Sequence, residues 1–260
     1  MGLKFTKMHG LGNDFIVIDG VNQSVTLTPD EIKALSDRQQ GVGFDQCLIV
    51  EPSTQGGIDF FYRIYNADGS EVGQCGNGAR ALARFIHHHG LSEKTDLTVA
   101  TQTTELKLKL NQDDTVTVNM GTPAFQEDVT LEGHALHCLT LGNPHAALIV
   151  ENLDNAQVSK LGPQIETHPH FKEGTNVGFI KILSPDEIKV RVHERGAGET
   201  QACGSGACAA AAFARKYHGA SEHITVHLLG GKLTVDWQGD APLYMTGPAS
   251  FVFEGELLDL

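Results

Sequence analysis

Long hydrophobic runs, basic clusters and abundant cysteines are all missing from this 260-residue chain. A helix that crosses a bilayer needs about 20 consecutive apolar residues, and the apolar stretches here are far shorter. The N-terminal segment MGLKFTKMHGLGNDF lacks the charged start, apolar core and small-residue cleavage site of a secretory signal. We therefore expect a cytoplasmic protein with no membrane partner.

Positive charge is scarce as well. Lysine and arginine number 19 against 32 aspartates and glutamates, which gives a formal net charge of −13. No basic run offers the electrostatic surface that nucleic acid requires, so no nucleic-acid partner is expected. The acidity itself is typical of a soluble surface, and a hydrophobic content of 40% predicts a buried core.

The cysteines are few and scattered. They occur at five positions, Cys47, Cys75, Cys138, Cys203 and Cys208. The odd number argues against a disulfide framework, and no C-x-x-C pair typical of a zinc site is present. A reducing cytosol, where thiols persist, suits this pattern.

Two of these cysteines lie in stretches that resemble each other. The first reads NADGSEVGQCGNGARALARF at residues 66–85, and the second reads ERGAGETQACGSGACAAAAF at residues 194–213. With Cys75 aligned on Cys203, an offset of 128, Glu71 meets Glu199 and the following glycines and alternate alanines coincide. This similarity indicates an internal repeat.

Shorter matches flank the repeat in the same order. GND at 12–14 parallels GNP at 142–144, and GVGF at 41–44 parallels NVGF at 176–179. Downstream, VNMGTP at 118–123 parallels YMTGP at 244–248. The shared order predicts two halves of about 120 to 130 residues.

Each half has a similar pattern of strands and helices. Strands are predicted at residues 15–19, 47–50, 59–65, 96–101, 105–110 and 115–120, and again at 145–150, 177–183, 187–194, 223–228, 232–237 and 243–247. Helices are predicted at 29–39, where Thr28 is the N-cap and Pro29 the first residue, at 76–90, and at 204–218.

The helix after Cys203 is alanine-rich on nearly every face, which indicates burial. We therefore predict an α+β fold of two pseudo-symmetric halves, each a curved, mostly antiparallel, barrel-like sheet wrapped around a central helix. Residues 1–120 would carry Cys75 and residues 121–249 would carry Cys203. The strand-like segment 250–260 is a candidate to return to the first half, and the active site is expected in the cleft between the halves.

Each Cys-Gly-x-Gly lies where a loop becomes a helix. Glycines there allow backbone amides to approach a ligand closely, and the helix N-terminus favours an anion. The same field favours a thiolate. An anionic group of a substrate bound at such a turn would therefore lie beside the sulfur.

Four interpretations of this cysteine pair follow. The repeat argues against two unrelated structural cysteines, a reducing compartment argues against a resting disulfide, and no nearby ligand set supports a metal. The fourth is a pair of thiols on opposite faces of one carbon, which would invert a stereocentre by removing and returning a proton. No lysine site typical of pyridoxal phosphate is evident, so we expect no cofactor, with backbone donors stabilising the carbanion.

Seven motifs are shared with a known family, in its order: MHGLGNDF (8–15), GFDQ (43–46), YRIYNADGSEVGQCGNGAR (62–80), GNPH (142–145), TNVGF (175–179), ERGAGETQACGSGACAA (194–210) and LYMTGPA (243–249). In these the chain resembles the diaminopimelate epimerases. The resemblance implies an isomerase, independent of metal and pyridoxal phosphate, that interconverts LL- and meso-2,6-diaminoheptanedioate for lysine and peptidoglycan precursor synthesis. It also implies a homodimer.

The resemblance assigns roles to matching positions. Cys75 and Cys203 would be the two catalytic bases, with His145 and Glu194 orienting the α-amino group and tuning the thiols. The remaining assigned residues bind substrate: the backbone amides of Gly76, Asn77, Gly204 and Ser205 hold the reacting carboxylate, Asn66, Asn143, Asn176, Glu194 and Arg195 contact polar ends, and Asn13 and Gln46 line the pocket. The three asparagines Asn13, Asn66 and Asn143 also suit turns, and His145 also suits a buried strand.

Two alternatives differ in substrate or class. A proline or hydroxyproline racemase would share the paired cysteines but needs no recognition of a distal amino acid group. A noncatalytic amino acid-binding protein or redox switch would not need both cysteines for turnover. The segment AFQEDVTLEGHALHC at 124–138 matches no family motif, and Cys47, Cys138 and Cys208 are expected to be buried as small hydrophobes.

Overall fold

The computed structural model of the chain describes residues 2–73 and 75–258. The described chain divides into two compact units, the first formed by residues up to Val118 together with those from Gly247 onward, and the second by Asn119–Thr246. No helix in these ranges is long and apolar enough to span a bilayer.

Within its described residues, the first unit contains a sheet and two helices. Its elements are β1 (Leu3–Gly10), β2 (Asn13–Asp19), α1 (Pro29–Ser36), β3 (Gln46–Pro52), β4 (Phe60–Asn66), β5 (Glu71–Val72), α2 (Gly76–His88), β6 (Asp96–Ala100), β7 (Glu105–Leu110), the first half of β8 (Val116–Gly121) and β19 (Ser250–Leu257). The last strand pairs antiparallel with β1, with Leu3 opposite Leu257. Residues 259 and 260 of the predicted final strand lie outside the described residues.

The second unit repeats this order. Its elements are β9 (Ala124–Phe125), β10 (Val129–Leu131), β11 (His134–Leu141), β12 (Asn143–Ile149), α3 (Val158–Glu166), β13 (Asn176–Ser184), β14 (Glu187–Glu194), β15 (Gly198–Glu199), α4 (Gly204–His218), β16 (His223–Leu228), β17 (Gly231–Asp236) and β18 (Leu243–Gly247). Strands β12 to β18 of the second unit correspond, in the same order, to strands β2 to β8 of the first unit.

The strand pairing is duplicated too. In the first unit β2 pairs with β3 and β4 with β6 in parallel, and in the second β12 pairs with β13 and β14 with β16 in parallel. The other described pairings within the units are antiparallel. The predicted α+β fold of two pseudo-symmetric halves, each a curved, mostly antiparallel sheet around a central helix, is confirmed; the sheets are mixed and do not close into barrels.

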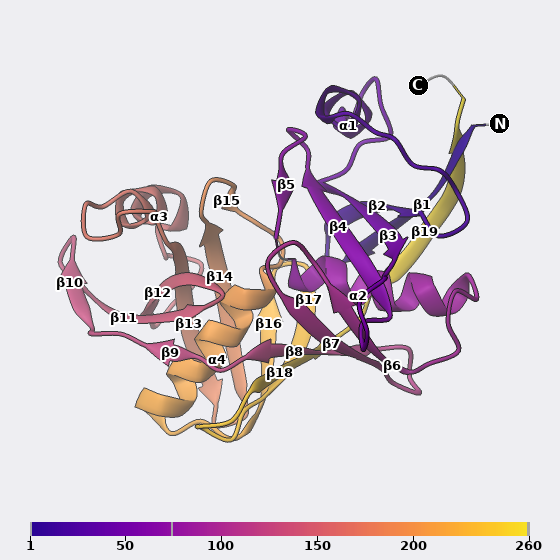
Figure 1. Cartoon of the computed structure of the whole chain (residues 1–260). Coiled ribbons are helices and arrows are strands. Elements are labelled where there is room, and N and C mark those ends of the chain that lie inside the picture. Colours follow the sequence, from indigo (N-terminus) through magenta and orange to yellow (C-terminus); the bar gives the residue numbers. More distant parts are fainter. Residues whose placement is uncertain (1, 74, 259–260) are drawn as a thin grey trace. The chain divides into compact units, whose positions relative to one another are not determined.

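The central helices α2 and α4 form the core of their units (Figure 1). Along α4 every residue from Gly206 to Ala214 is buried, because the small alanine side chains allow strands to approach from several sides. In α2 the largest buried side chain is Arg80, which is fully enclosed and donates from Nε to the carbonyl of Pro248 at 3.1 Å. The cysteine that begins each helix is therefore attached to a rigid element.

Several sequence predictions need correction. The first helix begins at Pro29 with Thr28 as N-cap, as predicted, but ends at Ser36, because Asp37 leaves the helical conformation. The alignment of GVGF with NVGF is wrong: residues 41–44 form a loop before β3, whereas residues 176–179 begin β13. The structural counterpart of Asn176 is Gln46, since each begins the strand that runs parallel to β12 or β2.

The unmatched segment at 124–138 forms β9, β10 and the first five residues of β11. A two-residue turn joins β10 to β11, with Leu131 opposite His134 and positive φ at both Glu132 and Gly133. This hairpin and α3 were not predicted. The strand β1 was not predicted either, because its apolar residues follow no simple alternation.

Candidate active site

Cys75 is the N-cap residue of α2. Its backbone is extended, and its Sγ accepts a hydrogen bond from the N–H of Gly78 at 3.2 Å. Sulfur thus takes the place that a serine or aspartate oxygen has in an ordinary cap. Because the first turn of a helix lacks intrahelical acceptors for its N–H groups, this turn favours an anion beside the half-buried sulfur.

Asparagine side chains connect Cys75 to the neighbouring strand. Asn13, directly after the β1–β2 turn, places its Oδ1 at 4.0 Å from Cys75 Sγ and accepts from Asn77 Nδ2 at 3.2 Å. Its Nδ2 donates to Asp45 Oδ2 at 3.0 Å. These contacts bring together three residues that the sequence analysis assigned to one site.

Gln46 and Asn66 form a second polar pair in the first unit. They lie opposite each other on β3 and β4, and Gln46 Nε2 donates to Asn66 Oδ1 at 3.0 Å. Asn66 also begins the tight β4–β5 turn, where its N–H donates to the carbonyl of Ser70 at 2.9 Å. It therefore has the turn function that asparagine favours as well as an amide in the polar pair.

Cys203 is the N-cap of α4 and repeats the geometry of Cys75. Its Sγ accepts from the N–H of Gly206 at 3.3 Å and lies 3.6 Å from Ser205 Oγ. The residue is only 4% exposed. Burial, and then the charge of Glu194, raise the pKa of the Cys203 thiol well above its usual value, although the bonds from Ser205 and Gly206 oppose this.

Glu194 ends β14 and is held by the loop that follows. Its Oε1 accepts a short hydrogen bond from Thr200 Oγ1. In the repeat, Glu194 takes the place of Asn66, because both begin the turn between paired strands. Glu194 therefore brings a carboxylate to Cys203, whereas the matching position in the first unit, Asn66, carries a neutral amide.

His145 lies on β12, three per cent exposed, with its Nε2 at 2.8 Å from Asn143 Oδ1. Burial, and then the charge of Arg195, lower the pKa of His145 to about 3. The imidazole is therefore neutral at physiological pH. Since an amide oxygen only accepts, Nε2 carries the ring proton and Nδ1 has the lone pair.

Asn176 and Arg195 are joined at the start of β13 and the end of β14. Asn176 Oδ1 accepts from the backbone N–H of Arg195 at 3.1 Å, and its Nδ2 donates to the carbonyl of Pro144 at 3.0 Å. The Arg195 guanidinium donates from Nη1 to the neutral carbonyl of Glu173 at 3.0 Å. The hydrogen bond to this carbonyl orients the guanidinium without neutralising its positive charge.

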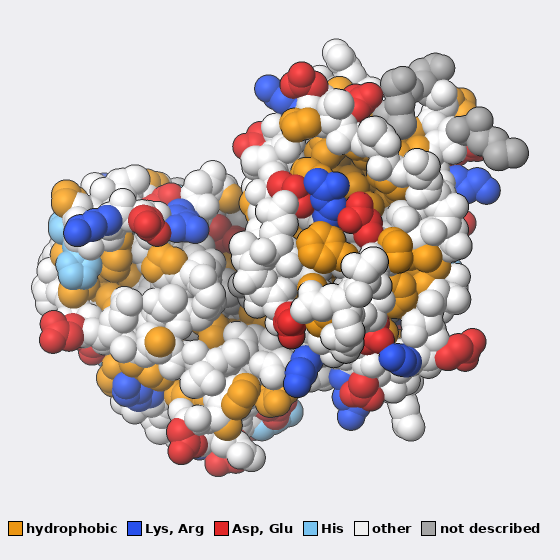
Figure 2. All heavy atoms as spheres, viewed as in Figure 1, with side chains coloured by type: hydrophobic (Ala, Val, Ile, Leu, Met, Phe, Trp, Pro, Cys, Tyr) orange, Lys and Arg blue, Asp and Glu red, His pale blue; other side chains and the backbone are white. Residues whose placement is uncertain are grey.

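An arginine–glutamate pair braces the loop before each cysteine. Arg63 on β4 binds Glu71 on β5 through Nε and Nη2, both at 3.0 Å. Figure 2 shows a basic side chain (blue) flanked by acidic side chains (red) on the surface over β4. Arg191 on β14 binds Glu199 on β15 in the same way, at 2.6 and 2.9 Å. The offset of 128 that aligns Glu71 with Glu199 also aligns Arg63 with Arg191. The two arginines were not predicted, although this signal was present.

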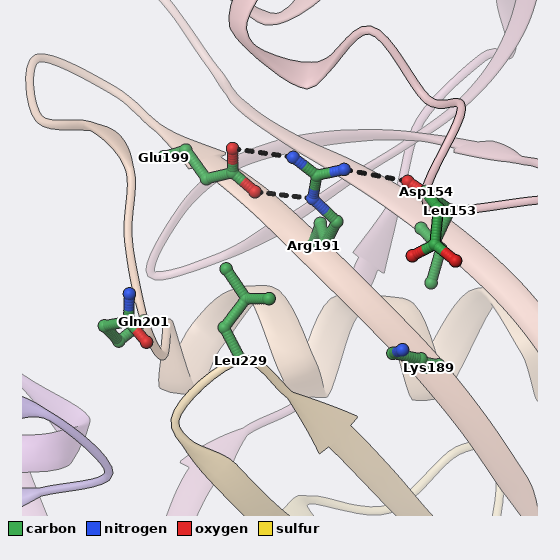
Figure 3. Close-up of a pocket in the computed structure, with 7 residues that line it drawn as sticks. All are labelled: Leu153, Asp154, Lys189, Arg191, Glu199, Gln201 and Leu229. Carbon is green, nitrogen blue, oxygen red and sulfur yellow. Dashed lines mark hydrogen bonds and ion pairs between the residues drawn. The ribbon is translucent and has the colours of Figure 1, made fainter.

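The second of these pairs lines a surface pocket (Figure 3). The pocket is formed by Leu153, Asp154, Lys189, Arg191, Glu199, Gln201 and Leu229. Arg191 Nη1 also donates to the carbonyl of Leu153 at 2.8 Å, which fixes the guanidinium between two segments. Neither Cys75 nor Cys203 lines this pocket, so the pocket is not the predicted site of proton transfer.

One group of neighbouring side chains consists of residue types that can bind a metal ion. His88, His89 and Glu254 place a ligand atom each within 4.8 Å of one another, on the exposed surface of the described part of the chain. His89 Nε2 is also 3.1 Å from Thr6 Oγ1. The group lies at the C-terminal end of α2, at the opposite end from Cys75.

Comparison with known proteins identifies the family. The profile described as diaminopimelate epimerase matches residues 5–126 and 137–252, leaving out the hairpin turn described above. The diaminopimelate epimerase of Legionella pneumophila strain Philadelphia 1 is 55% identical over 99% of this chain and 100% of its own. The chain belongs to the diaminopimelate epimerase family. It is therefore an isomerase.

The proteins of strains Corby and Lens of the same species are 55% and 54% identical over the same share of each chain. This identity favours the epimerase family over the alternative of a proline or hydroxyproline racemase. Solved structures of lower identity show the fold alone. A Bacillus anthracis phenazine biosynthesis protein of the PhzF family has a TM-score of 0.76 at 17% identity, covering 100% of both chains. A hydroxyproline epimerase from Agrobacterium vitis has a TM-score of 0.75 at 14% identity, covering 98% of this chain and 92% of its own.

Proposed function

We propose that this chain interconverts LL- and meso-2,6-diaminoheptanedioate, with Cys75 and Cys203 as the two bases. The observation that carries the proposal is the repeated cap: each cysteine accepts the N–H of the third residue of a central helix. Two thiols with the same helix-cap geometry on duplicated scaffolds suit a reaction whose forward and reverse directions are nearly equivalent. The product would serve lysine and peptidoglycan precursor synthesis.

The reaction is a proton transfer through carbon. One cysteine, as thiolate, removes the α-proton and becomes a thiol. The other, as thiol, gives its proton to the opposite face of the carbon and becomes a thiolate. The stereocentre is inverted, the total number of protons is conserved, and the protein is left in the complementary state that is ready for the reverse reaction.

The difficult step is the loss of a weakly acidic α-proton. Negative charge that leaves the carbon moves onto the α-carboxylate, where fixed donors stabilise it. The backbone N–H groups of Gly76 and Asn77, and those of Gly204 and Ser205, belong to the first turns of α2 and α4, where the helix dipoles add to the effect. These donors do not need to reorganise during the reaction.

Recognition of the distal amino acid group distinguishes this substrate from a single amino acid. We assign its carboxylate to Arg195, whose guanidinium is already oriented by a neutral carbonyl. Its ammonium group would be bound by the amide oxygens of Asn66, Asn143 and Asn176, with Asn13 and Gln46 lining the pocket. The neutral His145 imidazole, with the lone pair on Nδ1, and the Glu194 carboxylate suit the reacting α-ammonium group.

The test is incubation with LL-diaminopimelate in D₂O under reducing conditions, followed by proton NMR at the α-carbon. We expect deuterium to enter the α-position and meso isomer to accumulate, and no exchange would overturn the proposal. Cys75→Ser and Cys203→Ser should each lose epimerisation by about a hundredfold or more, since each removes one of two bases. The matched control is Cys208→Ala, in the alanine-rich interior of α4, which should retain activity.

We also propose that the protein acts as a cytoplasmic homodimer, as the family resemblance implies. Light scattering during gel filtration tests the dimer, with an expected mass of twice 28.0 kDa. A single species of 28.0 kDa at micromolar concentration would overturn it.

A further inference from the structure

Tyr62 on β4 has a buried hydroxyl with no partner. The side chain is fully enclosed, and no group in residues 2–73 or 75–258 forms a hydrogen bond with its Oη. A buried polar group normally finds a partner, and an exception calls for a functional explanation.

The hydroxyl and the Cys75 sulfur meet the same small volume beside Gly78. A Cβ added to Gly78 would lie 2.4 Å from Tyr62 Oη and 3.4 Å from Cys75 Sγ. Glycine at this position therefore allows the phenol oxygen to lie against the start of α2, beside the sulfur. The same residue donates its N–H to Cys75 Sγ at 3.2 Å, so the sulfur already accepts one hydrogen bond on this side.

The second unit has no such hydroxyl. At the offset of 128, the counterpart of Tyr62 is Val190, which is buried and apolar. A Cβ added to Gly206 would meet Val192 Cγ2 at 3.0 Å and Cys203 Sγ at 3.1 Å. Val192 matches Ile64 at that offset, so the residue beside Gly206 and the residue matching Tyr62 are both apolar. The ionisable neighbour of Cys203 is the Glu194 carboxylate.

We propose that Tyr62 donates a hydrogen bond to Cys75 when that sulfur carries the negative charge, so that the unliganded protein holds its thiolate on Cys75 and its thiol on Cys203. Tyr62 acts through Cys75 and is a positioning residue for the reaction. The inference rests on the proposed function, which it deepens by assigning the resting state of each base.

Other features of the site agree with this assignment. Burial, and then the charge of Cys75, raise the pKa of Tyr62 well above its usual value, so the phenol keeps its proton and remains a donor. Burial keeps Cys203 protonated in the same way. A thiolate on Cys75 and a thiol on Cys203 are the pair that one direction of the reaction requires.

Several other ionisable groups lie on neighbouring elements, each with a hydrogen-bond partner of its own or in the uncharged form. Burial raises the pKa of Cys47 on β3 to about 12, so it stays a thiol. Lys7 on β1 pairs with Asp14 at 2.6 Å, Asp45 accepts from Asn13, and Arg80 donates to a backbone carbonyl. Substitution of Tyr62 would therefore remove the proposed hydrogen bond to Cys75 and leave these other groups in place.

The test measures alkylation of Cys75 by iodoacetamide against pH, in a Cys203→Ser background, with the labelled site assigned by mass spectrometry. Tyr62→Phe should raise the midpoint of the rate profile by about one pH unit, since a hydrogen bond to a charged group is lost. Tyr65→Phe is the matched control, because residues 62 and 65 lie on opposite faces of β4, and its midpoint should not move.

Tyr62→Phe should melt at or above the temperature of the parent, because it removes an unpaired buried hydroxyl. An unchanged midpoint in a folded Tyr62→Phe protein would overturn the proposal. A second measurement needs no Tyr62 variant: the alkylation midpoint of Cys75 in Cys203→Ser should lie below that of Cys203 in Cys75→Ser, and the reverse order would overturn it. Both alkylation measurements are made without substrate turnover. A negative result in the D₂O experiment, which would overturn the proposed function, is therefore distinguishable from a negative result in the alkylation experiments.

Discussion

At the scale of single residues, burial decides the chemistry of the site more than residue type does. His145 would be half-charged at about pH 6.5 in water, but its enclosure on β12 makes the neutral form the stable one. The same burial keeps Cys203 a thiol although it begins a helix, a position that would otherwise favour a thiolate. Local position and environment therefore act in opposite directions.

His145 makes stability depend on pH. Its folded pKa of about 3 lies below the unfolded value, so the unfolded chain binds the additional proton between these values and stability falls as pH drops below about 6.5. Between pH 7.5 and pH 5 we expect the parent to lose about 2 kcal/mol that His145→Gln does not lose. Urea unfolding at both pH values measures this. The exposed His134→Gln serves as control and should behave as the parent does.

At the scale of elements, the arginine–glutamate pairs appear twice because the loop they brace appears twice. Each pair fastens the short strand β5 or β15 to the long strand before it, and the chain then reaches a cysteine within four residues. Partly exposed ion pairs contribute little to stability, at most about 1 kcal/mol. Their bidentate geometry instead fixes the path of the loop.

Arg191→Lys tests this role, because lysine keeps the charge but cannot form both bonds with Glu199. We expect kcat to fall by about tenfold while the melting temperature falls by no more than about 4 °C, the equivalent of about 1 kcal/mol. Arg215→Lys is the control, because its partner Glu222 is exposed and does not lie in a loop that precedes a cysteine. Equal losses of kcat in both variants would contradict a specific role for Arg191.

At the scale of the whole molecule, the chain leaves the first unit at Val118 and returns to it at Gly247. The final strand β19 completes the first unit by pairing with β1 along most of its length. The N-terminal sheet therefore depends on residues at the other end of the sequence, and its edge would be exposed without them.

Removal of residues 250–260 should thus damage the first unit selectively. We expect the melting temperature to fall by roughly 10 °C, because β1 loses a full ladder of hydrogen bonds. Hydrogen exchange should accelerate in β1 and β2 but not in β13. The control inserts two glycines between Glu132 and Gly133, in the hairpin turn outside the matched family regions, and should leave β1 protected.

The sequence by itself determined the features that depend on local spacing. The offset between Cys75 and Cys203 indicated two halves, the alanines after Cys203 predicted a buried helix, and Thr28 with Pro29 placed the start of α1. Capping and helix burial depend on residues within a few positions, so they can be read along the chain. The match of GVGF to NVGF failed because a four-residue similarity contains no information about strand pairing.

Tertiary structure alone decided which neighbours each cysteine has. The parallel pairs β2–β3 and β12–β13 bring Gln46 and Asn176 into equivalent places although their surrounding sequences differ. Tyr62 reads as an ordinary strand residue until its hydroxyl is seen to be buried, unpaired and close to Cys75. The physical reason is that solvation and hydrogen bonding are properties of the packed environment, which residues distant in sequence create together.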